Sequence, residues 1–264
     1  MLTFIGLGLY DERSITVEGR EALASVDRAF AEFYTSRLVG TTVAELEAFH
    51  DIEIDVRDRA GVERDPEPIL DAAEEADVAG DTMISTTHVD LRLRAHERGI
   101  GTRVIHGVSA QSAAAGLTGL QNYRFGKATT LPFPGAHGGG DVPDSVIETI
   151  EANRERDLHT LVYLDIKVDD PTADAAGLGE DERYMTGDYA AELLAENWQD
   201  ELGVVVARAG SPEPVVAADR LSALGDRDFG GPLHLLVVPA APHHLEAEAL
   251  EALAGAPAEL LDAN

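Results

Sequence analysis

The sequence contains no cysteine at any of its 264 positions. Disulfide bonds, cysteine-ligated zinc, iron–sulfur clusters and thiol nucleophiles are therefore excluded together. No apolar run approaches the ~18 to 20 residues of a membrane-spanning helix, and the first such run, residues 2–9, has no basic leader before it. We therefore expect a soluble protein of the cytoplasm that does not associate with membranes.

Basic side chains are scarce, and Lys127 and Lys167 are the only lysines. The chain has 49 acidic residues against 20 lysines and arginines, which gives a formal net charge of −29. A charge so far from zero repels itself unless salt screens it, so the composition predicts a halophilic protein. It also argues against a nucleic-acid partner, because no basic stripe is present to neutralise phosphates.

Three common kinds of catalytic site have no signal in the sequence. His243 and His244 are adjacent, so their side chains diverge on a helix instead of sharing a metal ion. Neither a Gly-x-Ser-x-Gly nucleophile turn nor a Walker phosphate loop occurs. We therefore expect no metal ion, no hydrolytic triad and no nucleotide phosphate loop.

Short apolar runs alternate with helical patterns along the whole chain. The predicted strands are 2–5, 29–33, 52–56, 102–106, 128–131, 160–165, 204–208 and 233–238. This rhythm predicts an α/β protein with a mostly parallel sheet covered by helices. The length favours two domains, which we place at 1–116 and 117–264, ahead of a glycine- and proline-rich loop.

Turns of small residues follow several of these strands. The five turns are 6–10, 80–84, 107–110, 164–166 and 207–210. Open α/β folds bind ligands at the carboxyl edge of the sheet, so together these turns predict a cofactor cleft between two α/β domains. Taken alone, the turn at Asp81 is more simply a helix cap.

Several sequence blocks in the same order resemble the diphthine synthases over nearly the whole chain. The blocks are 1–9, 11–16, 32–36, 80–81, 86–88, 104–106, 116–121, 123–127, 158–161, 164–167 and 205–211. The resemblance implies the tetrapyrrole methylase-like fold, also called the class III methyltransferase fold, with the cofactor between its two α/β domains. It also implies a homodimer that uses S-adenosyl-L-methionine. The substrate implied is elongation factor 2, whose aminocarboxypropyl-histidine is methylated on the amino group to a trimethylammonium.

The resemblance further implies cofactor contacts at eight positions. These are Leu9, Asp81, Ile84, Ser109, Ala110, Leu164, Ala209 and His234. The carboxylate of Asp81 suits a cationic methyl donor. His234 starts an apolar strand, where a hydrogen-bonded core histidine and a direct cofactor contact are equally consistent with the pattern. No residue identifies itself as the base that takes the acceptor's proton, so the catalytic residues remain unassigned.

Two features depart from the family pattern. Only Val78 and Ala79 separate Asp77 from the Gly80 turn, fewer than the ~5 residues of a typical strand. The acidic segment 169–182 is longer than expected, and we predict a solvated surface loop there. Two alternative functions stay open: a methyltransferase that acts on carbon atoms of a tetrapyrrole precursor, and a non-catalytic module that binds S-adenosylmethionine.

Overall fold

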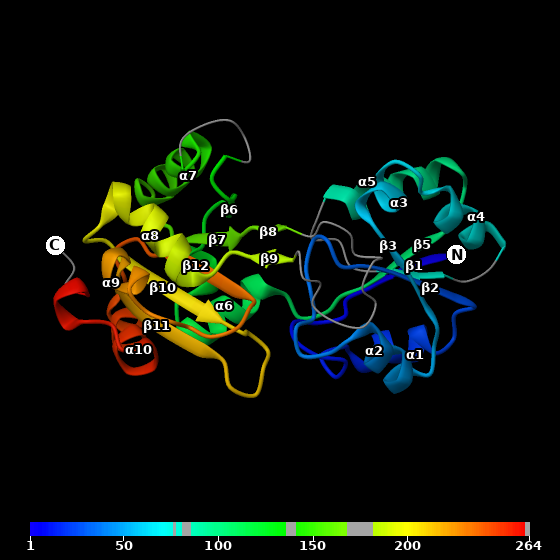
Figure 1. Cartoon of the computed structure of the whole chain (residues 1–264), viewed down its shortest axis with the longest axis horizontal. Helices are drawn as coiled ribbons and strands as arrows, with labels where there is room; N and C mark the ends of the chain where they lie inside the picture. The colour runs from blue at the N-terminus through cyan, green and yellow to red at the C-terminus, as the bar shows by residue number, and fades with distance from the viewer. Residues whose placement is uncertain (76–77, 81–85, 136–140, 168–181, 262–264) are drawn as a thin grey trace. The chain divides into compact units, whose positions relative to one another are not determined.

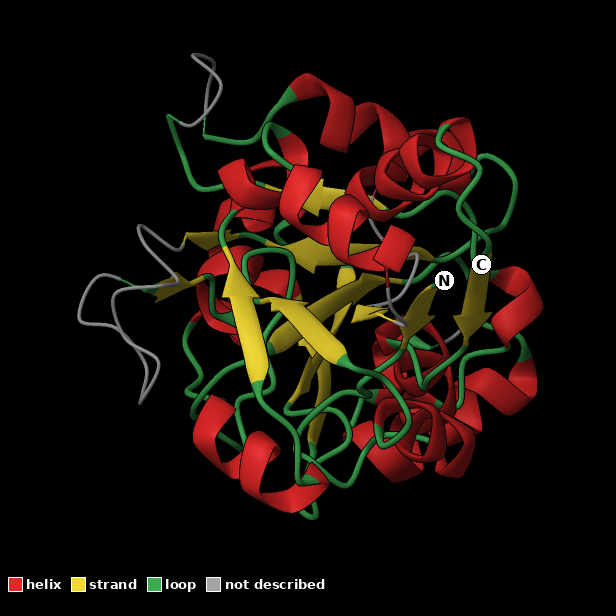
Figure 2. Cartoon of the chain, turned by 90° about the vertical axis from the view of Figure 1, so that its right-hand side faces the viewer, coloured by secondary structure: helices red, strands yellow, loops and turns green. Residues whose placement is uncertain are grey.

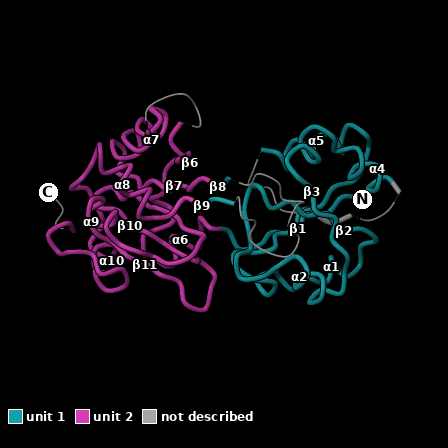
Figure 3. Tube along the Cα trace, viewed as in Figure 1, with its two compact units in different colours: residues 1–109, 166–183 teal, residues 110–165, 184–264 magenta. Residues whose placement is uncertain are grey.

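The computed structural model describes residues 1–75, 78–80, 86–135, 141–167 and 182–261 (Figure 1). It divides into two compact units (Figure 3). Unit 1 comprises residues 1–109 and 166–183, and unit 2 comprises residues 110–165 and 184–264. The boundary expected between residues 116 and 117 would instead fall inside helix α6 (Ala110–Thr118), which belongs entirely to unit 2.

Unit 1 contains a five-stranded sheet in the order β3-β2-β4-β1-β5. The strands are β1 (Leu2–Ile5), β2 (Arg28–Glu32), β3 (Ile54–Arg57), β4 (Val78–Gly80) and β5 (Thr102–Ile105). Every neighbouring pair in this sheet is parallel. The predicted parallel sheet is therefore confirmed for unit 1, and all its strands end at the same edge.

Helices cover both faces of this sheet (Figures 1 and 2). They are α1 (Val17–Leu23), α2 (Val43–His50), α3 (Arg59–Glu63), α4 (Glu67–Glu75) and α5 (Thr86–Glu97). Successive strand residues point to opposite faces, so Phe4 packs in one apolar cluster with Leu70 while Ile5 packs in another with Leu23. Thr16 begins α1 by accepting a hydrogen bond from the amide of Gly19, as a helix cap should.

Strand β4 has three residues, yet it pairs with a neighbour on each side. Val78 lies opposite Leu2 of β1 and opposite Arg28 of β2. The short apolar segment before Gly80 is therefore sufficient to form a central strand.

Unit 2 also contains a five-stranded sheet, in the order β11-β10-β12-β7-β6. Its strands are β6 (Thr129–Leu131), β7 (Thr160–Leu164), β10 (Leu202–Ala207), β11 (Val215–Arg220) and β12 (His234–Val238). Only the β6–β7 pair is parallel. The expectation of a mostly parallel sheet is wrong for this unit. The cause is β11, which the sequence analysis missed and which follows β10 without an intervening helix, so the two strands pair antiparallel.

Helices also cover both faces of the second sheet (Figure 1). Besides α6 they are α7 (Asp144–Arg154), α8 (Gly187–Trp198), α9 (Leu221–Gly225) and α10 (His244–Ala254), with 3₁₀ turns η1 (Asn122–Arg124) and η2 (Ala258–Leu260). Val205 packs on one face in a cluster with Leu194 of α8, and Val206 packs on the other with Leu250 of α10. All six residues of β10 are buried, which makes this strand the centre of the core.

A two-stranded ribbon of β8 (Ile166–Lys167) and β9 (Arg183–Tyr184) flanks the acidic segment. Of the predicted surface loop 169–182, residues 169–181 lie outside the described residues; the remaining residue, Glu182, pairs with Arg37 at 2.6 Å and its side chain is 6% exposed. Within the described ranges, every helix is too short or too polar to span a membrane.

Candidate functional site

In unit 1 the loops that follow β1 and β5 run against each other at the carboxyl edge of the sheet. The amide of Gly6 donates to the carbonyl of Ile105 at 3.0 Å. A Cβ atom on Gly107 would lie 2.9 Å from the carbonyl oxygen of Gly6, so this approach leaves no room for a side chain. Leu9 and Ser109 follow on these two loops, and both are partly exposed. The structure therefore brings these two predicted contacts to one edge lined by main-chain groups.

Two other predicted contacts, Asp81 and Ile84, lie outside the described residues. The strand before them, β4, lies between β1 and β2 and runs parallel to both.

A buried carboxylate ends strand β2 at the same edge. Glu32 is 6% exposed and accepts hydrogen bonds from the amides of Tyr34 and Thr35, both at 3.0 Å, and from the Thr35 hydroxyl. The Nε2 atom of His88, at the start of α5, lies 3.2 Å from Glu32 Oε1. Burial alone would raise the pKa of Glu32, but the contacts with His88 and Thr35 outweigh it and lower the pKa. Glu32 therefore stays ionised at neutral pH.

The Tyr34 hydroxyl is buried beside this carboxylate. It has no hydrogen-bond partner within the part of the chain that the structure describes. Burial and the negative charge of Glu32 raise the pKa of Tyr34 to about 12. The hydroxyl of Thr87, which lowers that pKa slightly, donates to Glu63 at 3.0 Å. Tyr34 thus keeps its proton at neutral pH. Neither Glu32 nor Tyr34 was among the predicted site residues, although their block is one of those that carry the family resemblance.

In unit 2 three predicted contacts gather at one edge of the sheet. The register Leu235 opposite Tyr163 places His234 beside Leu164, at the carboxyl end of β7. His234 also pairs with Ala207, the last residue of β10, and Ala209 follows two residues later. Leu164, Ala209 and His234 therefore surround the carboxyl ends of two strands that run in the same direction.

Ala110, the remaining predicted contact, is the first residue of α6. It is partly buried and packs against the same apolar cluster as Ala209. The structure thus places it on the same face of the sheet as Ala209.

The imidazole ring of His234 is 4% exposed, and both of its nitrogens are engaged. The amide of Gly187 donates to Nδ1 at 2.8 Å, and Nε2 donates to the carbonyl of Gly231 at 2.8 Å. Because Nδ1 accepts a hydrogen bond and Nε2 donates one, the ring is the neutral Nε2–H tautomer. Burial is the main cause of a lowered pKa, which agrees with a neutral ring. The ring nitrogens of His234 are therefore already bonded and are not available to a ligand at this edge.

Comparison with known proteins identifies the family. The family model of the tetrapyrrole (corrin/porphyrin) methylases matches residues 1–225. The diphthine synthase of Halorubrum lacusprofundi is 73% identical over 99% of this chain and 100% of its own length. The chain belongs to the diphthine synthases, a group within the tetrapyrrole methylase family. The predicted resemblance and fold are therefore confirmed.

Further diphthine synthases support the same assignment. The protein of Halobacterium salinarum is 69% identical over 99% of this chain and 100% of its own length. A crystal structure of diphthine synthase superposes with a TM-score of 0.86 at 39% identity, covering 98% of each chain. These relatives come from salt-adapted organisms, and this agrees with the acidic composition of the chain.

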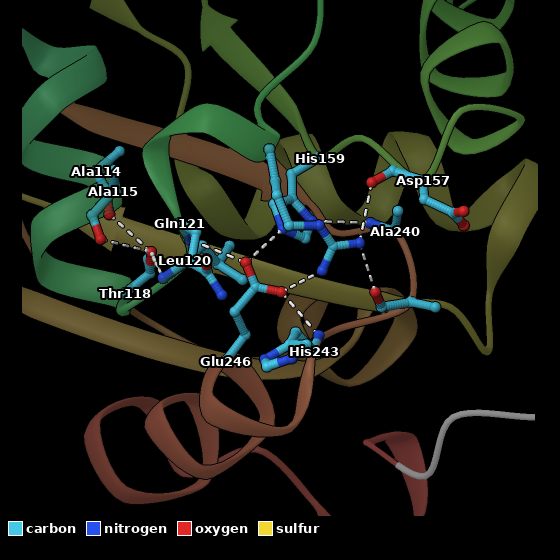
Figure 4. Close-up of polar contacts among 12 residues, drawn as sticks. Ala114, Ala115, Thr118, Leu120, Gln121, Asp157, His159, Ala240, His243 and Glu246 are labelled. Atoms are coloured by element: carbon cyan, nitrogen blue, oxygen red, sulfur yellow. Dashed lines mark hydrogen bonds and ion pairs between the residues drawn. The ribbon is translucent and has the colours of Figure 1, made fainter.

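A second buried histidine lies at the opposite edge of the unit 2 sheet, just before β7 (Figure 4). The amide of Ala240 donates to His159 Nδ1 at 3.1 Å, and His159 Nε2 donates to Glu246 at 3.1 Å. Glu246 is 0% exposed and also accepts from Arg124 and from the amides of Gln121 and His243. Burial lowers the pKa of His159, so this ring is neutral as well.

This network ties α10, β7 and the turn before η1 together. It lies at the amino end of β7, about 16 Å along the strand from Leu164. We assign it to stability of unit 2 in this diphthine synthase. Among the described residues, no group of three or more metal-binding side chains comes together.

Proposed function

We propose that this methyltransferase uses S-adenosylmethionine to methylate the amino group of the aminocarboxypropyl-histidine of elongation factor 2, up to the trimethylammonium. The observation that carries the proposal is the 73% identity to a diphthine synthase over 99% of the chain. As a diphthine synthase the chain is a methyltransferase of diphthamide biosynthesis. We also propose a cytoplasmic homodimer, on the family resemblance.

The carboxyl edges of both sheets suit a methyl donor that is held by main-chain groups. In unit 1 the approach of Gly6 and Gly107 leaves backbone without side chains next to Leu9 and Ser109. In unit 2 Leu164, Ala209 and the main chain of His234 surround the carboxyl ends of β7 and β10. We propose that these residues bind S-adenosylmethionine together with Ala110, Asp81 and Ile84. When bound, the donor supplies an electrophilic methyl group on its sulfonium.

Positioning is the main task left to the protein, because methyl transfer to an amine needs neither a metal ion nor a covalent enzyme intermediate. Holding two reactants in line converts a bimolecular step into an effectively unimolecular one. The ionised carboxylate of Glu32 lies at the carboxyl edge of the unit 1 sheet, where its charge favours cationic groups. The high pKa of Tyr34 excludes its hydroxyl as the base at neutral pH.

The decisive experiment incubates the protein in concentrated salt with labelled S-adenosylmethionine and elongation factor 2 that carries the aminocarboxypropyl group. Label on the histidine, with methyl groups counted by mass spectrometry, is the expected result. Unmodified elongation factor 2 is the matched control and should stay unlabelled. Transfer only to a tetrapyrrole precursor, or cofactor binding without transfer, would contradict the proposal. Light scattering of the purified protein tests the dimer separately.

A further inference from the structure

We propose that the imidazole of His234 is a positioning residue for the cofactor, which clamps the start of α8 to the loop 229–231 and so shapes the binding edge of unit 2. The inference rests on the proposed function, because it assumes that the donor binds at this edge. It differs from a direct contact, since both ring nitrogens already have partners within unit 2.

The first half of the clamp fixes the beginning of a helix. The Thr186 side chain stands at the N-cap of α8 without making a capping hydrogen bond. The amide of Gly187, the first residue of the helix, donates to His234 Nδ1 instead. A helix leaves its first amides without partners inside the helix. The side chain of His234, on strand β12, supplies one of these missing partners for α8. A Cβ atom on Gly187 would lie 2.5 Å from Val205 Cγ1, which shows how tightly this helix start packs on β10.

The second half fixes a loop that borders Ala209. His234 Nε2 donates to the carbonyl of Gly231, which also accepts from Arg208 at 3.3 Å. The same guanidinium donates to the carbonyl of Phe229 at 2.7 Å. Arg208 directly precedes Ala209 and has a φ of 53°, in the region that favours glycine. Arg208 therefore joins the loop that His234 fixes to the turn that carries a proposed cofactor contact.

Only the neutral ring can make both bonds. A protonated Nδ1 would face the Gly187 amide as a second donor, so the first bond would be lost. The charged groups that face the ring are Asp188 on α8, which favours protonation, and Arg208, which opposes it. Burial outweighs both and lowers the pKa of His234. We therefore expect the clamp to hold at neutral pH and to open as the pH falls through this lowered pKa.

The test measures cofactor affinity by calorimetry in the wild type, His234→Asn and His234→Gln at pH 7.5 and at successively lower pH values at which the protein stays folded, in concentrated salt. The oxygen of Asn can replace Nδ1, and the amide of Gln can replace Nε2, so each variant keeps one half of the clamp. We expect about tenfold weaker binding of S-adenosylmethionine at pH 7.5. The wild-type affinity should fall with pH, whereas neither variant contains a titrating group at this position and both should lose that dependence.

The matched control is His159→Asn together with His159→Gln. His159 has the same tautomer and similar burial but lies at the other edge of the sheet. These variants should lower the melting temperature and leave the cofactor affinity within about twofold of wild type. Equal weakening by the His159 and His234 variants would overturn the proposal, because it would indicate general loosening of unit 2. Unchanged affinity and pH dependence in the His234 variants would overturn it as well. A wild type that binds no S-adenosylmethionine would contradict the proposed function instead.

Discussion

Two buried histidines with the same bonding pattern lie at opposite edges of the unit 2 sheet. In both His234 and His159, Nδ1 accepts a hydrogen bond from a main-chain amide and Nε2 donates one. They differ in the group that accepts from Nε2. His159 donates to the carboxylate of Glu246, whereas His234 donates to a loop carbonyl.

This difference separates a stabilising role from a positioning role. The Glu246 network binds a buried charge to four donors and connects elements far apart in the chain, so its loss should affect the whole unit. The His234 ring connects one helix start to one loop beside the ligand edge, so its loss should affect that edge first. The same side chain in the same tautomer can therefore serve either role, and its neighbours decide which.

The largest effect should come from Glu246→Gln, which tests whether the His159–Glu246 network stabilises unit 2. The variant leaves Arg124 and three other donors around a neutral amide, so we expect the free energy of unfolding to fall by about 3 to 5 kcal/mol. Denaturant unfolding in concentrated salt measures the change. The exposed Glu248→Gln on the same helix is the control. If both variants unfold at the same denaturant concentration, the network has no stabilising role.

A smaller effect is expected from Glu32→Gln, which extends the comparison to the ligand edge of unit 1. The change removes the negative charge and replaces one carboxylate oxygen with an NH2 group, so the two amides on Oε2 and the Thr35 hydroxyl on Oε1 cannot all keep their acceptors; we expect a cost of about 1 to 3 kcal/mol at pH 7. The pKa of Glu32 is lowered in the folded protein, so its contribution is present above the ordinary glutamate range and is lost as the pH falls through the folded pKa. Unfolding curves at pH 7 and below pH 4 should therefore show the difference shrinking in acid.

The matched control for this change is Glu53→Gln, on the exposed surface of the same unit. It should have little effect at either pH. A difference between wild type and Glu32→Gln that grew in acid would contradict the assigned direction of the Glu32 pKa.

The smallest effect should come from Tyr34→Phe, because the change removes a single buried hydroxyl. The hydroxyl is buried without a hydrogen bond to any described residue, so its loss should leave stability unchanged or raise it by up to about 1 kcal/mol. Thermal unfolding is the measurement, with the exposed Tyr123→Phe as control. Clear destabilisation would show that the hydroxyl has a partner in the folded protein.

Local patterns in the sequence predicted much of the fold. The strand predicted over residues 2–5 has the same bounds in the structure, where it is β1. Thr16 and Thr42 stand at the N-caps of α1 and α2, where threonine is a favoured residue. Strand β11 was missed, although its pairing with β10 makes the second sheet mostly antiparallel. The five-residue helix α3 was also missed, because so short an element carries little periodicity.

The candidate site residues were named only through the family resemblance. The turns after strands indicated an edge, but nothing local in the sequence shows that His234 meets Gly187, 47 residues earlier. The burial of Glu32 and Tyr34 also depends on packing between distant elements, so their sequence block gave no sign of it. Contacts of this kind set the chemistry of the edge and appear only when the chain is folded.

A crystal structure of the protein with S-adenosylhomocysteine tests the central claim most directly. We predict the ligand against the main chain of Leu164, Ala209 and His234 and against the glycine loops after β1 and β5, with the His234 ring still bonded to Gly187 and Gly231. A ligand bound beside His159, or in contact with a ring nitrogen of His234, would contradict the account.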